Sequence, residues 1–165
     1  PIVYKRIVRV IQSIAPYFSD FYFNVSAANT VRLQWTDKFS SIVYGPTDLS
    51  DGTIRFIALT TLFLQPVPPK VIIIDEPELG LHPLAIQKLA GLIKAAAAKG
   101  TQVIIATQSA DLISNFDAED VLTVNQIDGV SVMKRLEAET LDAWLEDYTL
   151  GDLWKQNILK GGQPK

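Results

Sequence analysis

The run of four β-branched residues at positions 71–74 most constrains what this chain can fold into. A continuous apolar run without polar alternation is typical of a strand that is buried on both faces of a parallel sheet. Residues 102–106 have the same character. Between the two runs, Pro83 is suited to the first turn of a helix over residues 83–98, and Gly100 is suited to its end. The spacing predicts a β-α-β unit with a right-handed crossover, so the middle of the chain is expected to be α/β with a parallel sheet at its core.

The N-terminal third predicts a helix followed by antiparallel strands. Apolar residues recur at helical spacing over residues 2–15 and favour an amphipathic helix, although a strand is the alternative for so β-branched a run. Aromatic and β-branched runs at 21–25 and 31–35, with a turn residue between them, indicate an antiparallel hairpin. Residues 42–44 suggest a third short strand.

The remaining segments predict one buried helix, a second hairpin and a helical tail. Residues 53–64 are apolar on nearly every side, which is typical of a buried helix. Asp128-Gly129, between residues 121–125 and 130–134, is a strong signal for a two-residue hairpin turn. From position 137 onward we expect one or two surface helices. Their packing residues are expected to be Leu141, Trp144, Leu145, Leu153 and Trp154.

Composition excludes several classes of protein. The chain has 165 residues, no cysteine and one histidine, which excludes a disulfide framework and a zinc centre. The apolar stretch at 56–71 carries three prolines and several polar residues, so it is unsuited to a membrane span, and residues 1–6 lack the order of a secretory signal. We therefore expect a cytoplasmic protein. A net charge of −3 argues against a strongly basic nucleic-acid surface, and the small basic cluster Lys5, Arg6 and Arg9 is interpreted as a solvated helix face.

Two acidic residues, Asp75 and Glu76, follow directly after the strand expected at 71–74. Open α/β sheets bind their ligands at this carboxyl edge. Because carboxylates there are usually compensated by a cation, Asp75 is suited to a Mg²⁺ shell and Glu76 to orienting and deprotonating a water in phosphoryl transfer. The alternative is an acidic turn that caps the next helix.

Three further segments carry polar residues at element ends. Ser50, Asp51 and Gly52 precede the buried helix and are suited to an anion site at its N-terminus, or to an ordinary helix cap. Gln108 follows the second buried strand, beside the acidic pair if the strands are neighbours, and its amide suits a terminal phosphate or the attacking water. The alternative for Gln108 is a strand-end turn. His82 is interpreted as a polar residue beside a helix start, without a catalytic role.

These segments, taken in order, resemble the C-terminal half of an ABC-type ATPase domain. The motifs are Leu-Ser-Asp-Gly-Thr at 49–53, Asp-Glu-Pro at 75–77, Gly-Leu-His-Pro at 80–83 and Thr-Gln-Ser at 107–109. More narrowly, the chain resembles bacterial predicted AAA-type ATPases related to RecF, to the heads of structural-maintenance-of-chromosomes (SMC) proteins and to the overcoming-lysogenization-defect (OLD) proteins. The resemblance is strong over residues 47–124, and residues 150–154 support it more weakly. It implies a P-loop NTPase fold of which this chain is a partial domain.

The resemblance implies a role for each matching residue. Ser50, Asp51 and Gly52 match the signature that reaches the γ-phosphate of ATP bound by a partner subunit. Asp75 matches the Walker B residue that holds Mg²⁺ through water, and Glu76 matches the general base.

Two further matches concern the dimer interface and the switch. Residues 78–82 match the loop that crosses the interface of a homodimer, and Gln108 takes the switch position, which is usually His in the family. Glutamine hydrogen-bonds a phosphate but carries no charge, which leaves the rate of hydrolysis open.

The phosphate-binding loop of the family is absent from the sequence. That loop needs Gly-Lys before Ser or Thr, and no Gly-Lys dipeptide occurs in the 165 residues. We therefore expect residues 1–165 to be one C-terminal portion of a longer ATPase domain: a helix and hairpin region at 1–48, the signature, Walker B and switch region at 49–125, and a hairpin with terminal helices at 126–165. Alone, this chain is expected to bind ATP weakly or not at all.

The expected function is ATP binding and hydrolysis by a dimerising ATPase linked to DNA maintenance, repair or phage defence. Direct DNA binding is only weakly supported by the charges. One alternative is a non-catalytic dimerisation or regulatory module, but such a module has no chemical need for the intact pair Asp75-Glu76. The other alternative is the ATPase subunit of a membrane transporter. The transporter alternative predicts a His switch and a Gly-Gly-Gln signature, where this chain has Gln108 and residues 51–53.

Overall fold

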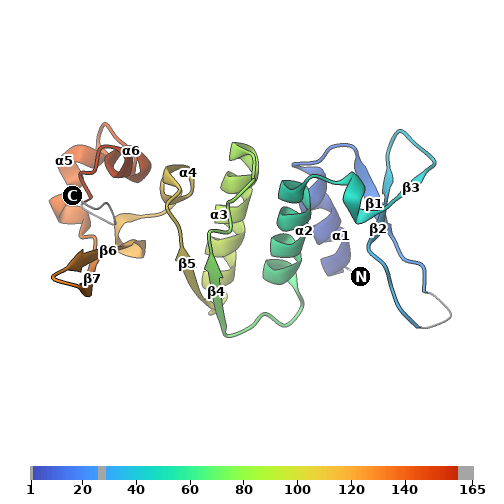
Figure 1. Cartoon of the computed structure of the whole chain (residues 1–165), viewed down its shortest axis with the longest axis horizontal. Helices are drawn as coiled ribbons and strands as arrows, with labels where there is room; N and C mark the ends of the chain where they lie inside the picture. Colours follow the sequence, from blue (N-terminus) through green and yellow to red (C-terminus); the bar gives the residue numbers. More distant parts are fainter. Residues whose placement is uncertain (1, 26–28, 160–165) are drawn as a thin grey trace. The chain divides into compact units, whose positions relative to one another are not determined.

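The computed structural model describes residues 2–25 and 29–159, and the chain divides into two compact units, Pro1–Ile105 and Ala106–Lys165 (Figure 1). The first unit contains three helices and the strands of two sheets in its described part. Its elements are α1 (Ile2–Gln12), β1 (Phe18–Tyr22), β2 (Gln34–Asp37), β3 (Val43–Tyr44), the 3-10 turn η1 (Pro46–Asp48), α2 (Asp51–Leu64), β4 (Val71–Asp75), α3 (Pro83–Ala97) and β5 (Gln102–Ala106), whose last residue begins the second unit.

Helix α1 confirms the helical interpretation of the first segment over the strand alternative. It packs against β1 and α2, and α2 packs in turn against α3, so the three helices lie side by side (Figure 1). The helix ends at Gln12, three residues earlier than expected, and Ser13 and Ile14 continue it as a turn through hydrogen bonds to Val10 and Ile11.

Strands β1, β2 and β3 form an antiparallel sheet in that order, which confirms the predicted hairpin and third strand, although β1 begins three residues before the run expected at 21–25 and β2 begins three residues after the start of the run expected at 31–35. An isolated antiparallel bridge between Val25 and Val31 extends the pairing beyond β1 and β2; residues 26–28 lie outside the described residues.

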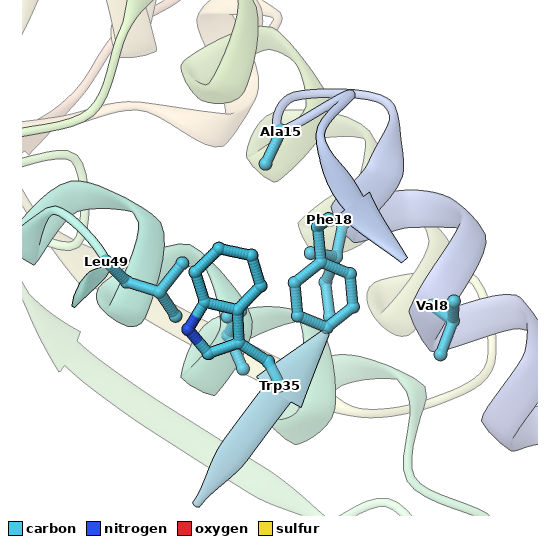
Figure 2. Packing of buried hydrophobic residues seen from close by; sticks show 7 residues of the cluster. Val8, Ala15, Phe18, Trp35 and Leu49 are labelled. Carbon is cyan, nitrogen blue, oxygen red and sulfur yellow. The ribbon is translucent and has the colours of Figure 1, made fainter. Parts of the chain in front are cut away.

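The core between α1 and this sheet is aromatic. The Phe18 and Trp35 rings are nearly parallel at 15° with centroids 5.8 Å apart, and Trp35 also stacks on Tyr44 at 4.8 Å. Figure 2 shows Trp35 lying between Phe18 and Leu49, with Val8 of α1 beyond Phe18. The indole Nε1 of Trp35 donates to the carbonyl oxygen of Gly45 at 2.9 Å, so the buried ring leaves no unpaired donor. This cluster fixes Leu49, the residue just before the start of α2.

Strands β4 and β5 are hydrogen-bonded neighbours joined through α3, which confirms the predicted β-α-β unit. The expectation that residues 71–74 are buried on both faces is wrong for this chain. Ile72 is 5% exposed, but Val71 and Ile73 are 47% and 72% exposed. Successive side chains of a strand point to opposite faces, so Val71 and Ile73 share the exposed face of β4 and Ile72 lies on the opposite, buried face.

Helix α2 is buried as predicted, on the sides that face its neighbours. Its buried residues are Thr53, Phe56, Ile57, Leu59, Thr60, Phe63 and Leu64. Thr60 has no exposed surface, and its Oγ1 has no hydrogen-bond partner. Arg55 is the sole charged residue of the helix after its first turn, and it lies on the exposed side.

The second unit is a small assembly of short helices and one hairpin. Its elements are α4 (Ala110–Ile113), η2 (Ala118–Asp120), β6 (Leu122–Ile127), β7 (Val130–Arg135), η3 (Ala138–Thr140), α5 (Asp142–Leu145) and α6 (Leu150–Lys155). Strands β6 and β7 pair antiparallel around Asp128 and Gly129, whose φ angles of 51° and 81° fit a two-residue hairpin turn and confirm the prediction.

The tail packs through most of the residues predicted for it. Leu141 and Leu153 are buried in the cluster of the second unit, and Leu145 and Trp154 lie against it. Trp144 differs from the expectation, because it is 44% exposed; its ring lies near that of Tyr148, with centroids 6.2 Å apart. None of the helices in the described ranges has the length and apolar character that crossing a bilayer requires.

Candidate functional site

The acidic pair lies at the carboxyl end of β4, as the sequence predicts. Asp75 is the last residue of the strand and is exposed, and Glu76 follows it with a φ of 42°. This left-handed conformation costs a residue other than glycine about 1 kcal/mol or more. The chain therefore turns sharply at Glu76, out of the direction of the strand and into a loop over residues 77–80.

Arg55 holds the turn at Glu76 from helix α2. Its Nη1 donates to the carbonyl oxygen of Glu76 at 3.0 Å, and this hydrogen bond spans 21 positions of the sequence. A guanidinium donor strengthens such a bond relative to a neutral donor. Sequence reasoning missed Arg55, although a lone cation in an otherwise apolar helix was a signal that could have drawn attention to it.

The start of α2 packs directly against the same loop. Ser50 caps the helix, because its Oγ accepts from the backbone N–H of Thr53 at 3.1 Å. A Cβ atom on Gly52 would lie 2.1 Å from the carbonyl oxygen of Gly80, closer than real contacts allow. Gly52 is therefore required where two backbones meet, and Gly80 itself has a φ of 74°, which favours glycine.

A small pocket lies where the starts of α2 and α3 meet. Its volume is about 130 Å³, and it is lined by residues of both segments. The start of α2 contributes Ser50, Gly52 and Thr53. The start of α3 and the loop before it contribute Gly80, Leu81, His82, Leu84 and Ala85, and Ile14 also lines the pocket. His82 is the N-cap of α3, and its Nδ1 accepts from the backbone N–H of Leu84 at 3.2 Å. The structure thus brings together residues 50–53 and 80–82, which the sequence had singled out separately.

The loop between these segments has one buried acid and one exposed apolar residue. Glu78 is only 8% exposed, whereas Leu79 beside it is 52% exposed. Asp51, in the first turn of α2, is exposed as well.

Gln108 belongs to the second unit, directly after β5, and its side chain is exposed. The indole Nε1 of Trp154 donates to the carbonyl oxygen of Gln108 at 3.1 Å. On the other side, Thr107 Oγ1 accepts from the backbone N–H of Ser109 at 2.9 Å, and Ser109 caps α4. Sequence reasoning assigned Trp154 to packing and did not connect it with Gln108.

The donor set at the acidic pair suits Mg²⁺ that is shared with a phosphate. In the described ranges no group of three His, Asp or Glu side chains is arranged to hold a metal ion by itself. Mg²⁺ is commonly bound through one or two carboxylates, several waters and the phosphates of a substrate, without an all-protein cage. One exposed carboxylate, Asp75, at the end of a strand meets that requirement.

Comparison with known proteins shows similarity to an AAA domain model and to a transporter ATP-binding protein. Residues 45–114 match the family model described as "AAA domain, putative AbiEii toxin, Type IV TA system". The ATP-binding protein EcfA2 of the energy-coupling factor transporter of Lactobacillus delbrueckii subsp. bulgaricus is 28% identical over 137 residues, which cover 81% of this chain and 47% of that protein. This chain therefore spans about half the length of that relative.

Solved structures with a similar fold include SMC ATPase heads. A chain described under "Structural biochemistry of ATP-driven dimerization and DNA stimulated activation of SMC ATPases" superposes with a TM-score of 0.63 and 18% identity, over 98% of this chain and 93% of that one. The Smc head domain of Pyrococcus furiosus, bound to the C-terminal domain of ScpA, gives 0.66 and 20% over 88% and 37%. The chain carries an ABC- and SMC-like P-loop ATPase fold. The fold class and the resemblance expected from the motifs are thereby confirmed.

Proposed function

We propose that this chain supplies the signature segment, the Walker B carboxylates and the switch glutamine of an ATPase that dimerises around two ATP molecules. The observation that supports this most directly is the contact between the start of α2 and the loop after Glu76. Gly52 and Gly80 touch backbone to backbone, and Arg55 of the same helix binds the Glu76 carbonyl. If residues 50–52 only capped a helix and residues 75–76 only formed an acidic turn, neither the contact between Gly52 and Gly80 nor the hydrogen bond from Arg55 would be needed.

In this proposal the two carboxylates divide the work. Glu76 orients the attacking water and accepts its proton as the water oxygen bonds to the γ-phosphorus of ATP, while the bond from that phosphorus to the β,γ-bridging oxygen breaks and ADP leaves. Asp75 holds the hydration shell of Mg²⁺, which supplies neutralisation of the phosphate charge when it is bound. Arg55 fixes the backbone of Glu76, so that the carboxylate is aimed before ATP arrives.

The signature segment is proposed to serve the ATP of a second subunit. The first turn of a helix presents backbone N–H groups that favour an anion, and Ser50, Asp51 and Gly52 lie at that turn of α2. The exposed Leu79, in the loop over residues 78–82, is suited to the interface of such a homodimer. Gln108 is proposed to donate its side-chain amide to the γ-phosphate or to the water.

The phosphate-binding loop of this ATPase is proposed to come from a part of the protein outside residues 1–165. The open face of β4, with Val71 and Ile73 exposed, supports this, because apolar strand residues normally lie against another layer. The P-loop half of the same domain is the proposed cover. For the same reason, the 165-residue chain alone is expected to have little or no ATPase activity.

The decisive experiment compares Glu76→Gln with wild type in the full-length protein. We expect ATP binding to persist while hydrolysis slows by about 10²-fold or more, because the variant keeps the shape of the side chain and loses the base. Glu146→Gln, the same change at an exposed residue of the second unit, is the matched control and should leave turnover unchanged. Unchanged turnover in Glu76→Gln would refute its assignment as the base.

The cellular process that we propose is DNA maintenance, repair or phage defence, in which ATP-driven closure of the dimer acts on DNA. The shared fold with SMC heads supports this proposal. The similarity to a transporter ATP-binding protein favours a second candidate, an ATPase subunit of a transporter. Stimulation of the ATPase by double-stranded DNA would favour the first candidate, and co-purification with a membrane subunit would favour the second.

A further inference from the structure

Helix α6 packs in close backbone contact against α4, the helix that follows Gln108. A Cβ atom on Gly151 would lie 2.2 Å from the carbonyl oxygen of Ala110 and 2.2 Å from Ser114 Oγ. Only glycine permits this approach of α6 to α4. Ser114 Oγ also donates to Thr149 Oγ1, the N-cap of α6, at 3.1 Å, and Leu153 is completely buried beneath the helix.

This packing of α6 places the indole of Trp154 against residues 107–109, the segment that contains the proposed switch residue Gln108. The Nε1–H group donates to the carbonyl oxygen of Gln108, while Thr107 Oγ1 accepts from the next N–H, that of Ser109. The peptide group after Gln108 is therefore held on both its oxygen and its nitrogen. The side chain of Gln108 itself remains exposed. A fixed backbone below an exposed side chain limits the directions in which the side chain can point, which preorganises a group for its reaction.

We propose that Trp154 is a positioning residue for Gln108, so that the C-terminal helix α6 sets the aim of the switch glutamine during ATP hydrolysis. This inference rests on the proposed function. A tryptophan needed only for packing requires no donor at this position, and Phe would fill the same space. Here the indole N–H reaches a carbonyl oxygen 46 positions earlier in the sequence. The hydrogen bond from Trp154 thus links helix α6 to Gln108, the residue that is proposed to hydrogen-bond the γ-phosphate.

The test is a double-mutant cycle on kcat and KM in the full-length protein. Trp154→Phe keeps a large aromatic ring and removes the donor, and one hydrogen bond of ordinary strength corresponds to about a 3- to 10-fold change in rate. We expect kcat to fall by that factor while KM for ATP stays constant. In the Gln108→Ala background we expect Trp154→Phe to have no further effect, because the two changes act on one step. Trp144→Phe, at the exposed tryptophan of the same unit, is the matched control.

A second readout does not depend on activity. In the isotope-labelled full-length protein, the ¹³C resonance of the Gln108 carbonyl should shift in Trp154→Phe and stay in place in Trp144→Phe. The same spectra show whether each variant is folded.

The outcomes separate the inference from the proposed function. Additive effects of Gln108→Ala and Trp154→Phe on kcat, or an unmoved Gln108 carbonyl resonance, would overturn the positioning role alone. A full-length wild-type protein without ATPase activity, or Gln108→Ala with normal kcat, would overturn the proposed function or its switch residue, and the inference with it.

Discussion

The contact between Gly52 and Gly80 makes a quantitative prediction about the start of α2. A Cβ atom at position 52 would lie 2.1 Å from the Gly80 carbonyl oxygen, whereas ordinary contacts begin at 3.4 Å, so about 1.3 Å (3.4 less 2.1) must be recovered by movement of backbone. Overpacking of this kind costs about 1–3 kcal/mol, and the better helix propensity of alanine returns at most about 1 kcal/mol. We expect Gly52→Ala to lower the free energy of unfolding by about 2 kcal/mol.

Gly91 offers a matched control within the same unit. It lies in the interior of α3, and a Cβ atom there would meet nothing within 4 Å. Gly91→Ala should therefore raise the free energy of unfolding by about 0.5–1 kcal/mol, since only the helix propensity changes. The same substitution is expected to act in opposite directions at two helical glycines.

Urea unfolding followed by circular dichroism measures both effects. With an m value of about 2 kcal/mol/M, the midpoint should fall by about 1 M for Gly52→Ala and rise by about 0.3–0.5 M for Gly91→Ala. If Gly52→Ala were as stable as Gly91→Ala, the close approach of α2 to the loop after Glu76 would be refuted. The proposed function would then lose one of the two contacts that support it most directly, the contact between Gly52 and Gly80.

Two further substitutions test the buried and capping groups. Thr60→Val should raise the melting temperature by about 2–4 °C, because it replaces a fully buried hydroxyl that has no hydrogen-bond partner with a methyl group of similar size; Thr60→Ser, which keeps the hydroxyl, should not. Thr149→Ala should cost about 1 kcal/mol at neutral pH through loss of the α6 N-cap. Hydrogen bonds from Thr149 to the Asp152 carboxylate lower the pKa of Asp152 below its ordinary value of 3.8, so the stabilisation that these particular hydrogen bonds give is present above that pH and is lost as the pH falls through the folded-state pKa. In Thr149→Ala an NMR titration should find the pKa of Asp152 closer to 3.8, and a wild-type value in the variant would contradict the capping role.

Much of the local structure follows from short-range patterns in the sequence. The β-branched runs predicted β4 and β5, Asp128-Gly129 predicted the turn between β6 and β7, and Ser50 was named as a possible cap of α2. Each of these features depends on the conformational preferences of a few neighbouring residues, so it can be predicted without knowledge of the fold. The order of the motifs likewise sufficed to indicate the ATPase fold that the comparisons confirm.

The errors have one physical cause, which is that burial depends on the layers that surround a residue. A run such as residues 71–74 is suited to burial on both faces, but the hydrophobic pattern does not say which covering layers belong to the same 165 residues. Trp144 was assigned to packing for a similar reason, because a large aromatic residue in a tail is more often buried than exposed.

What the sequence determined by itself is the set of elements, their order and the chemistry available at their ends: carboxylates after β4, an amide after β5, and a Ser-Asp-Gly start to α2. What only the tertiary structure decided is which of these ends touch. Gly52 meets Gly80, Arg55 reaches the Glu76 carbonyl, and Trp154 binds the Gln108 carbonyl, across 28 (80 less 52), 21 and 46 positions respectively. Each of these contacts ends on a backbone carbonyl oxygen, which every residue has, so the sequence does not mark which carbonyl is the partner, and the contacts exist only once the helices and strands have packed.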